Sequence, residues 1–318
     1  MRRFKNILCA IEPEAGCHAA VERAVTLAEN NQAHLTLVAV ADLALASGGL
    51  GPRPRDALGL SATLEGLAAP YAGRLTVRTR VLQGTPVLEL IRQVLRGKHD
   101  LLIKVAEQAD WLERLLGSDD IELLRKCPCP LWLCRADEPS NYRSILVAVD
   151  PDDSYPAAEL EARQALNRQA LEMAVSLALS DFAELHLVHV WDAVGEAVMR
   201  GAILAVPQGQ VSAYVDQVHQ RRAAHVDALL REVTGRVGGD AIAYLKPQVH
   251  LIRGQAREEI PALAKRLGSD LIIMGTVART GVPGLLMGNT AEAILDRIDC
   301  AVLAIKPPGF VTPIALDG

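Results

Sequence analysis

The sequence contains the same pattern twice. Residues 6–13 (NILCAIEP) match residues 144–151 (SILVAVDP), and both are apolar runs that end in an acidic residue and a proline. Further apolar runs correspond in the same order: 33–40 with 183–190, 78–84 with 248–254, 99–103 with 269–273, and 130–134 with 301–305. Apolar residues at helical spacing separate these runs. A repeat of this kind indicates one folding unit present twice.

Each copy is predicted to hold five strands that alternate with helices. This alternation favours parallel pairing through right-handed crossovers. Half of the 318 residues are apolar but only 3% are aromatic, which suits parallel strands covered by helices. We therefore predict an α/β protein with two tandem doubly wound, Rossmann-like domains, each with a five-stranded parallel sheet. Such sheets bind ligands beyond the carboxyl ends of the strands, where the strand order reverses.

The boundary between the copies is predicted in a short polar segment that contains proline. We expect domain 1 at residues 1–136, a linker at 137–142, domain 2 at 143–308 and a tail at 309–318. The last strand of each copy is apolar and would be an exposed sheet edge in a separate domain. We expect these two strands to pair across the domain interface as an intramolecular pseudo-dimer, and the sequence also allows a homodimer.

A glycine-rich segment follows the fourth strand of the second copy, at residues 274–290 (MGTVARTGVPGLLMGNT). The apolar residues after it recur at helical spacing, so a helix is predicted to begin at Gly288 to Thr290. Glycines allow the backbone to approach a phosphate, and a helix start offers free N–H groups and partial positive charge. Glycines also serve ordinary turns, and Asn289 or Thr290 would also suit a helix cap.

This loop resembles that of the universal stress protein family. Nucleotide-binding members carry Gly, two residues, Gly, nine residues, Gly and then Ser or Thr after the fourth strand. Gly275 and Gly288 match, whereas Ala278 replaces the second glycine and Asn289 replaces the Ser or Thr. The resemblance covers essentially the whole chain, is closest to the E-type tandem members, and implies the adenine nucleotide alpha hydrolase-like form of the Rossmann fold.

The resemblance also implies a set of ligand contacts. Asp150 matches the acid that contacts the nucleoside, and Val190 matches the residue whose backbone faces the base. Asp150 would also suit a turn or helix cap, and Arg279 would suit a solvated loop as well as a phosphate contact. The expected nucleotide-binding residues are Asp150, Val190, Met274, Gly275, Ala278, Arg279, Gly288, Asn289 and Thr290. The expected ligand is ATP or another adenine nucleotide with Mg, and no cofactor is expected to be needed for folding.

The first copy lacks these features. Lys104 stands where Met274 stands in the second copy, and residues 109–116 are compatible with a helix instead of a glycine loop. Asp119 and Asp120 begin the last helix, where a phosphate would need positive charge. We predict no nucleotide in this half.

The bulk composition narrows the class of protein. The net charge of −5 disfavours direct binding of nucleic acid. No signal segment and no 18-residue apolar run is visible, so we expect a cytoplasmic protein with no membrane span. The six cysteines are predicted to be reduced and structural, and no metal motif is evident.

Two segments suggest another ligand. Residues 193–207 are apolar and irregular, and residues 43–64 are their counterpart in the first copy. The first of these could line an apolar cavity beside the crevice, which favours a lipid-like or acyl ligand. The amphipathic helix predicted at 212–233 is interpreted as core packing.

The leading hypothesis is a stress-response protein that binds an adenine nucleotide in the second domain. The alternative is a scaffold without nucleotide, or a binder of an apolar or acyl ligand, that acts through protein partners. No nucleophile–histidine–acid arrangement is visible, so we predict no enzyme, with slow ATP hydrolysis left open. His189 and His250 fall within predicted strands and are interpreted as core or surface groups.

Overall fold

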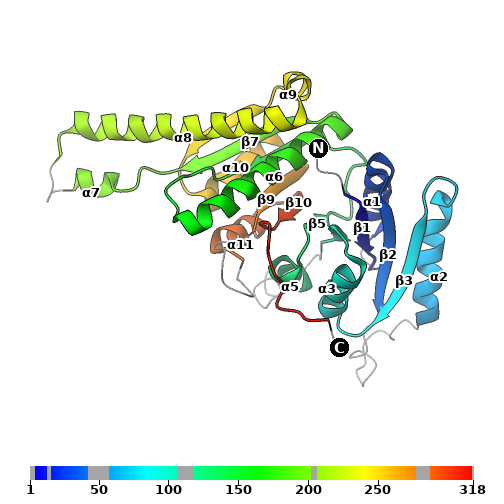
Figure 1. Ribbon diagram of the computed structural model, residues 1–318. Coiled ribbons are helices and arrows are strands. Elements are labelled where there is room, and N and C mark those ends of the chain that lie inside the picture. Colours follow the sequence, from blue (N-terminus) through cyan, green and yellow to red (C-terminus); the bar gives the residue numbers. More distant parts are fainter. Residues whose placement is uncertain are drawn as a thin grey trace.

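All ten predicted strands form, and they lie side by side in one sheet (Figure 1). The computed structural model describes residues 4–12, 16–41, 57–106, 118–201, 206–276 and 287–316. The strands are β1 (Asn6–Ala10), β2 (His34–Ala41), β3 (Val77–Gln83), β4 (Leu101–Val105), β5 (Leu131–Cys134), β6 (Ser144–Ala148), β7 (Glu184–Trp191), β8 (Gln248–Arg253), β9 (Leu271–Gly275) and β10 (Ala301–Ile305). Their order in the sheet is β3-β2-β1-β4-β5-β10-β9-β6-β7-β8.

The two halves of the sheet have the same topology. Within each half all strand pairs are parallel, which confirms the doubly wound fold predicted from the repeat. The strand order reverses beside β1 and β4 in the first half and beside β6 and β9 in the second. These two places are the potential ligand crevices.

The last strands of the two repeats pair with each other, as the sequence predicts. β5 and β10 are antiparallel, and Leu303 faces Trp132 at the centre of the contact. Each strand thereby covers the edge that the other would expose. The two repeats therefore share one continuous sheet.

Helices cover both faces of this sheet. They are α1 (His18–Asn31), α2 (Ala57–Ala68), the 3₁₀ helix η2 (Ala69–Tyr71), α3 (Pro86–Gly97), α5 (Asp119–Lys126), α6 (Ala157–Asp181), α7 (Glu196–Arg200), α8 (Gln208–Val237), α9 (Gly239–Leu245), α10 (Ala256–Leu267) and α11 (Asn289–Leu295). One hydrophobic cluster joins the strands to α1, α2, α6 and α8. The other joins them to α3, α5, α10 and α11. Side chains alternate between the two faces, so every central strand contributes to both clusters.

Helix α8 is longer at both ends than the helix predicted at 212–233. Its second half packs in the core through Val226, Leu229 and Val233, as expected. Its first half projects from the body together with α7, and Val215 and Val218 are only half-buried there (Figure 1).

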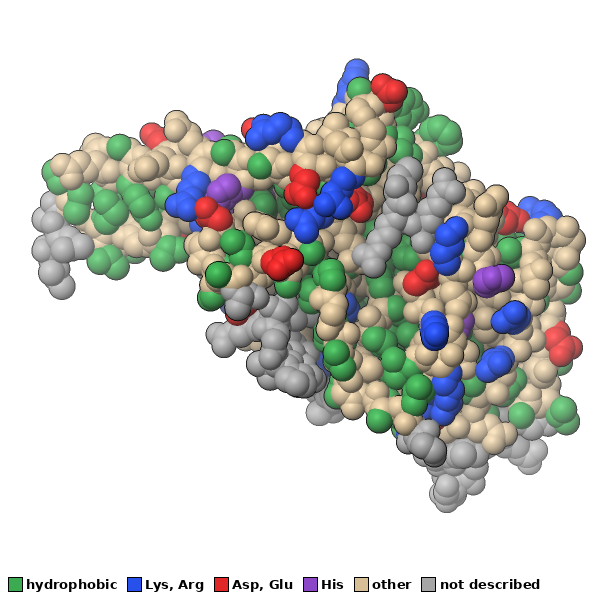
Figure 2. Space-filling model, viewed as in Figure 1, with side chains coloured by type: hydrophobic (Ala, Val, Ile, Leu, Met, Phe, Trp, Pro, Cys, Tyr) green, Lys and Arg blue, Asp and Glu red, His purple; other side chains and the backbone are tan. Residues whose placement is uncertain are grey.

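The apolar runs predicted as irregular are partly helical. Residues 196–200 form α7 within the run 193–207, and residues 57–64 of the run 43–64 belong to α2. Residues 43–56 and 202–205 lie outside the described residues. Hydrophobic side chains are visible along the projecting α7 and α8 in Figure 2.

The cysteines agree with their predicted structural character. Basic and acidic side chains are interspersed on the face shown in Figure 2. All six cysteines are free, and all except Cys300 are buried. Within the described ranges, no helix is both long enough and apolar enough to cross a bilayer.

Candidate ligand-binding site

A cavity of about 760 Å³ lies at the carboxyl ends of β6, β7 and β9, where the strand order of the second repeat reverses. Open α/β sheets bind their ligands at such places. The cavity is lined by these residues of the predicted site: Asp150, Val190, Met274, Gly275, Gly288, Asn289 and Thr290. The remaining two, Ala278 and Arg279, lie outside the described residues.

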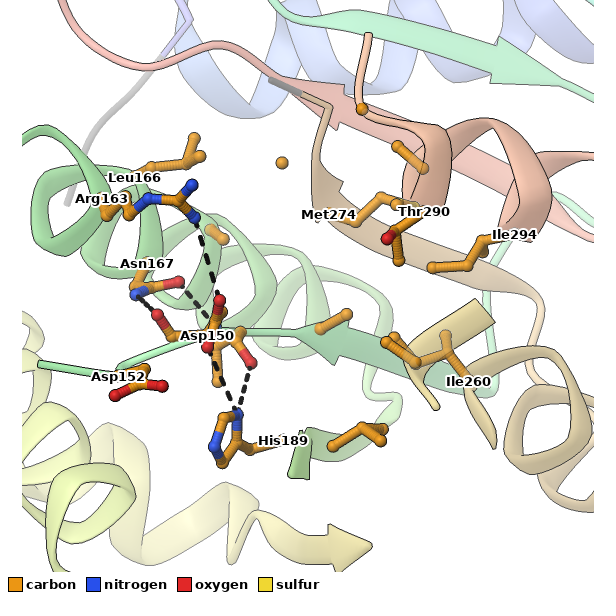
Figure 3. Close-up of a pocket in the computed structure, with 18 of the residues that line it drawn as sticks. Asp150, Asp152, Arg163, Leu166, Asn167, His189, Ile260, Met274, Thr290 and Ile294 are labelled. Carbon is orange, nitrogen blue, oxygen red and sulfur yellow. Dashed lines mark hydrogen bonds and ion pairs between the residues drawn. The ribbon is translucent and has the colours of Figure 1, made fainter. Parts of the chain in front are cut away.

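Asp150 is held in place through its backbone. Its N–H donates to Asn167 Oδ1 at 2.9 Å, and Asn167 Nδ2 donates to the Asp150 carbonyl oxygen at 2.8 Å. Asn167 lies on α6 and is buried. Because both of its polar groups are used on Asp150, the end of β6 is fixed against α6 and the carboxylate faces the cavity (Figure 3).

The carboxylate of Asp150 has two further neighbours on the α6 side. Tyr155 donates its hydroxyl to Asp150 Oδ2 at 2.6 Å, and Arg163 Nη1 lies 3.9 Å from the same oxygen. The Arg163 guanidinium also stacks 3.6 Å from the centre of the Tyr155 ring. Burial, and then the negative charge of Asp150, raises the pKa of Tyr155, so this phenol remains a donor. Sequence reasoning missed Tyr155, Arg163 and Asn167.

His189 lies on β7 in the cavity wall. Its Nδ1 is 3.2 Å from the carbonyl oxygen of Val149 and 3.9 Å from Asp150 Oδ1. Burial lowers the pKa of His189, although the neighbouring Asp150 opposes this shift. His189 is therefore a core group, one of the two settings predicted for it, but the residue also belongs to the cavity. His250 lies elsewhere on β8, against His186.

The cavity has a polar side and an apolar side. Figure 3 shows Asp150, Asp152, Arg163, Asn167 and His189 on one side. The opposite side carries the apolar residues Met274, Ile260 and Ile294, from β9, α10 and α11, together with Thr290 at the start of α11. This division suits a ligand with a flat or apolar part joined to a polar part.

The helix start predicted at Gly288 is present. Gly288 is the N-cap residue of α11, and its N–H donates to the carbonyl oxygen of Thr276 at 3.0 Å. This bond ties the start of α11 to the end of β9. Thr276 in turn accepts a hydrogen bond of 3.0 Å from the buried Lys306, whose pKa burial lowers to about 8.

The corresponding place in the first repeat contains an ion-pair cluster. Lys104 is buried at the end of β4, with its Nζ 2.9 Å from Glu12 Oε1 and 2.7 Å from Asp120 Oδ1. Burial alone would lower the pKa of Lys104, but Asp120 and Glu12 raise it overall. Asp120 thus neutralises a lysine at the helix start. Glu12 occupies the position that Asp150 has in the second repeat.

Neither crevice presents an evident metal centre. Among the residues with described positions, no three His, Cys, Asp or Glu side chains are grouped so that they could hold a metal ion.

The family relationship is clear from comparison with known proteins. The model of the universal stress protein family matches residues 3–135 and 141–306. The chain belongs to the universal stress protein family. The two matches follow each other along the chain, so this universal stress protein carries the family fold in tandem, as the repeat predicts.

Several relatives are similar over much of their length. Universal stress protein E of Escherichia coli is 30% identical over 239 residues, which is 74% of this chain and 70% of that protein. Universal stress protein E of Photorhabdus laumondii is 29% identical over 99% of this chain and 98% of its own. A functionally unknown protein solved from Pseudomonas aeruginosa aligns with a TM-score of 0.71 and 25% identity, over 96% of this chain and 93% of that chain.

Proposed function

We propose that this universal stress protein binds an adenine nucleotide in the cavity of its second repeat and serves a stress response without robust catalysis. The observation that supports the proposal is the convergence of Asp150, Val190, Gly275 and Gly288 on one cavity. These residues come from separate elements and are the ones that the family pattern singles out. A volume of about 760 Å³ is suitable for a ligand of nucleotide size.

The two sides of the cavity suggest how the nucleotide would be held. The base would lie against the apolar side near Met274 and Ile260, with the backbone of Val190 at its edge. Asp150 would contact the nucleoside, and Gly288 to Thr290 would lie near the phosphates, which would bring Mg with them. Another universal stress protein has been crystallised in complex with cAMP. The proposal for this chain rests on its own cavity.

A binding role fits the site better than catalysis. The hydrogen bond from His189 Nδ1 to Val149 orients the ring, and no Ser, Cys or Lys side chain is found among the cavity-lining residues that the structure describes. A general base needs a proton within reach in the bound ligand. The protein would therefore report or store its ligand, and any hydrolysis of ATP would be slow.

Isothermal titration calorimetry with Mg·ATP tests the proposal. We expect one ATP per chain, and we expect Asp150→Ala to weaken binding at least about tenfold because it removes the carboxylate beside the ligand. Glu12→Ala is the matched control, since Glu12 holds the equivalent position in the first repeat. Equal affinities of the wild type and Asp150→Ala, or no binding at millimolar ATP, would contradict the proposal.

The apolar side of the cavity supports a second candidate, a ligand with an acyl chain. Met274, Ile260 and Ile294 contribute apolar side chains to one side of the cavity, and Val194 also belongs to its lining. An acyl chain buries well against such side chains. Extraction of the purified protein with organic solvent, followed by mass spectrometry, would detect a stoichiometric acyl species if this candidate is correct.

A further inference from the structure

The second repeat carries additional chain between its first strand and its first helix. β1 and β6 begin at Asn6 and Ser144, a step of 138 residues, whereas the helices that follow end against Gln32 and Phe182, a step of 150. Residues 157–167 of α6 therefore precede the position that matches the start of α1 at His18. This added part of α6 has no counterpart in α1.

The additional chain is anchored to Asp150. Tyr155, just before α6, and Arg163, in the added part of α6, both line the cavity. Tyr155 donates its hydroxyl to Asp150 Oδ2 at 2.6 Å, and the Arg163 guanidinium lies 3.6 Å from the centre of the Tyr155 ring. Arg163 is itself paired with Glu159, one turn earlier on α6, at 3.5 Å. The guanidinium therefore supports the ring while the hydroxyl of Tyr155 holds the carboxylate.

The hydroxyl of Tyr155 determines which oxygen of Asp150 remains for a ligand. A hydroxyl that donates to a carboxylate makes a short and strong hydrogen bond, so Oδ2 is committed to Tyr155. Among the described residues no hydrogen bond ends on Oδ1, and Nδ1 of His189, 3.9 Å away, faces the carbonyl oxygen of Val149 instead. The side chain of Asp150 is 46% exposed and belongs to the cavity lining, so a ligand can reach it.

The acid at this position has a different partner in each repeat. In the first repeat, Glu12 pairs with the ammonium group of Lys104 at 2.9 Å. In the second repeat, Asp150 accepts from the neutral phenol of Tyr155, and its ion pair with Arg163 has the longer distance of 3.9 Å. A carboxylate held by a neutral hydroxyl keeps its charge and remains a strong acceptor. Tyr155 thus orients the acid without neutralising it.

We propose that Tyr155 is a positioning residue of the nucleotide site, which holds Oδ2 of Asp150 so that Oδ1 accepts a hydrogen bond from a hydroxyl or amino group of the nucleoside. This inference rests on the proposed function. It assigns the additional chain of the second repeat to ligand binding, because Tyr155 and Arg163 both belong to it. An acceptor that is already oriented lowers the cost of ordering the site when the ligand binds.

Calorimetry with Mg·ATP and with adenosine tests this role in the wild type, Tyr155→Phe, Asp150→Ala and the double variant. Tyr155→Phe keeps the ring against Arg163 but removes the hydroxyl. We expect it to weaken the binding of both ligands by the same factor, about three- to tenfold, because Tyr155 acts at the nucleoside and not at the phosphates. In the Asp150→Ala background the same substitution should change the affinity less than about twofold, because Tyr155 acts through Asp150.

Tyr71→Phe is the matched control and should bind both ligands as the wild type does. Tyr71 also lies against an arginine, with Arg74 5.6 Å from the centre of its ring, but it belongs to the first repeat. A general loosening of the fold in Tyr155→Phe would weaken binding equally in the wild-type and Asp150→Ala backgrounds. That result, or unchanged affinity of Tyr155→Phe, would overturn the positioning role while the proposed function stands. If the wild type binds neither ATP nor adenosine, both fail.

Discussion

Gly275 lies at the end of β9 against a side chain of α6. A Cβ atom on this residue would lie 2.5 Å from Leu166 Cδ2, well inside van der Waals contact. An added Cβ atom here would therefore force Leu166 of α6 to shift, whether or not a phosphate binds. The glycine that the family pattern assigns to the ligand therefore also packs against α6, and its substitution tests this packing first.

We expect Gly275→Ala to lower the free energy of unfolding by about 1–3 kcal/mol, because the added methyl group displaces Leu166. In a Leu166→Ala background the same substitution should cost much less. Urea denaturation of the wild type, the two single variants and the double variant measures the coupling energy between the two positions. Gly66→Ala is the control, since Gly66 lies in α2 with nothing within 4 Å of its added Cβ. If Gly275→Ala lowers the free energy of unfolding equally in the wild-type and Leu166→Ala backgrounds, the added methyl group does not clash with Leu166.

The site depends on how helices meet the ends of strands. Helix α6 brings Asn167 to the end of β6, and β7 brings His189 and Trp191 beneath α8. Asn167 makes its two hydrogen bonds with one residue, Asp150. The position of the carboxylate is therefore set by the contact between α6 and β6.

Asn167→Leu should move Asp150 because it removes the two hydrogen bonds that hold the backbone of Asp150. We expect a loss of about 1–3 kcal/mol in the free energy of unfolding, because the backbone groups of Asp150 lose both partners. We also expect weaker ATP binding, by about tenfold, measured by calorimetry. Arg168→Gln is the matched control on the next position of α6, where Arg168 pairs with Glu232 at 3.4 Å. Retention of full ATP affinity in Asn167→Leu would show that these two hydrogen bonds do not position Asp150 for ligand binding.

The strands and the paired edges were predictable because apolar periodicity and the repeat determine them. The start of α11 was predictable for the same reason. The contact of Asn167 with Asp150 was not, because it depends on the register of α6 against β6, which no local pattern encodes. The contact of Tyr155 with Asp150 depends on the conformation of the loop that joins them. The length of α8 was underestimated at both ends, because residues 208–210 and 234–236 contain no apolar side chain that continues the predicted stripe. The ion pairs of Lys104 join residues from three separate segments of the chain. A residue-by-residue comparison of the two repeats therefore did not reveal them.

The two repeats are joined by a buried polar cluster as well as by the sheet. Arg23 of α1 lies 2.7 Å from Asp181 of α6 and 3.9 Å from Glu138 of the predicted linker. Tyr142 packs beneath the guanidinium at 4.0 Å. One buried cation thus faces two buried carboxyl groups. Burial raises the pKa of Glu138 to about 7, so this carboxyl group keeps its proton in mildly acidic solution.

The free energy of unfolding of the chain should depend on whether Glu138 carries this proton. The folded chain binds it more tightly than the unfolded chain does, because the pKa of Glu138 rises on folding from 4.5 to about 7. Its contribution is complete below pH 4.5 and is lost as the pH rises to about 7. We expect Glu138→Gln to remove about 2–3 kcal/mol of this pH dependence, measured by urea denaturation from pH 4.5 to 8. Glu232→Gln, on exposed α8, is the control, and identical pH profiles for Glu138→Gln and the wild type would contradict the assignment.

The whole molecule is an asymmetric pseudo-dimer in which one crevice holds an ion-pair cluster and the other holds a cavity. Native mass spectrometry of the wild type, before and after addition of millimolar ATP with Mg, tests this account most directly. We expect a mass increase of one nucleotide per chain, and none in Asp150→Ala. Two nucleotides per chain, or none at millimolar ATP, would contradict it.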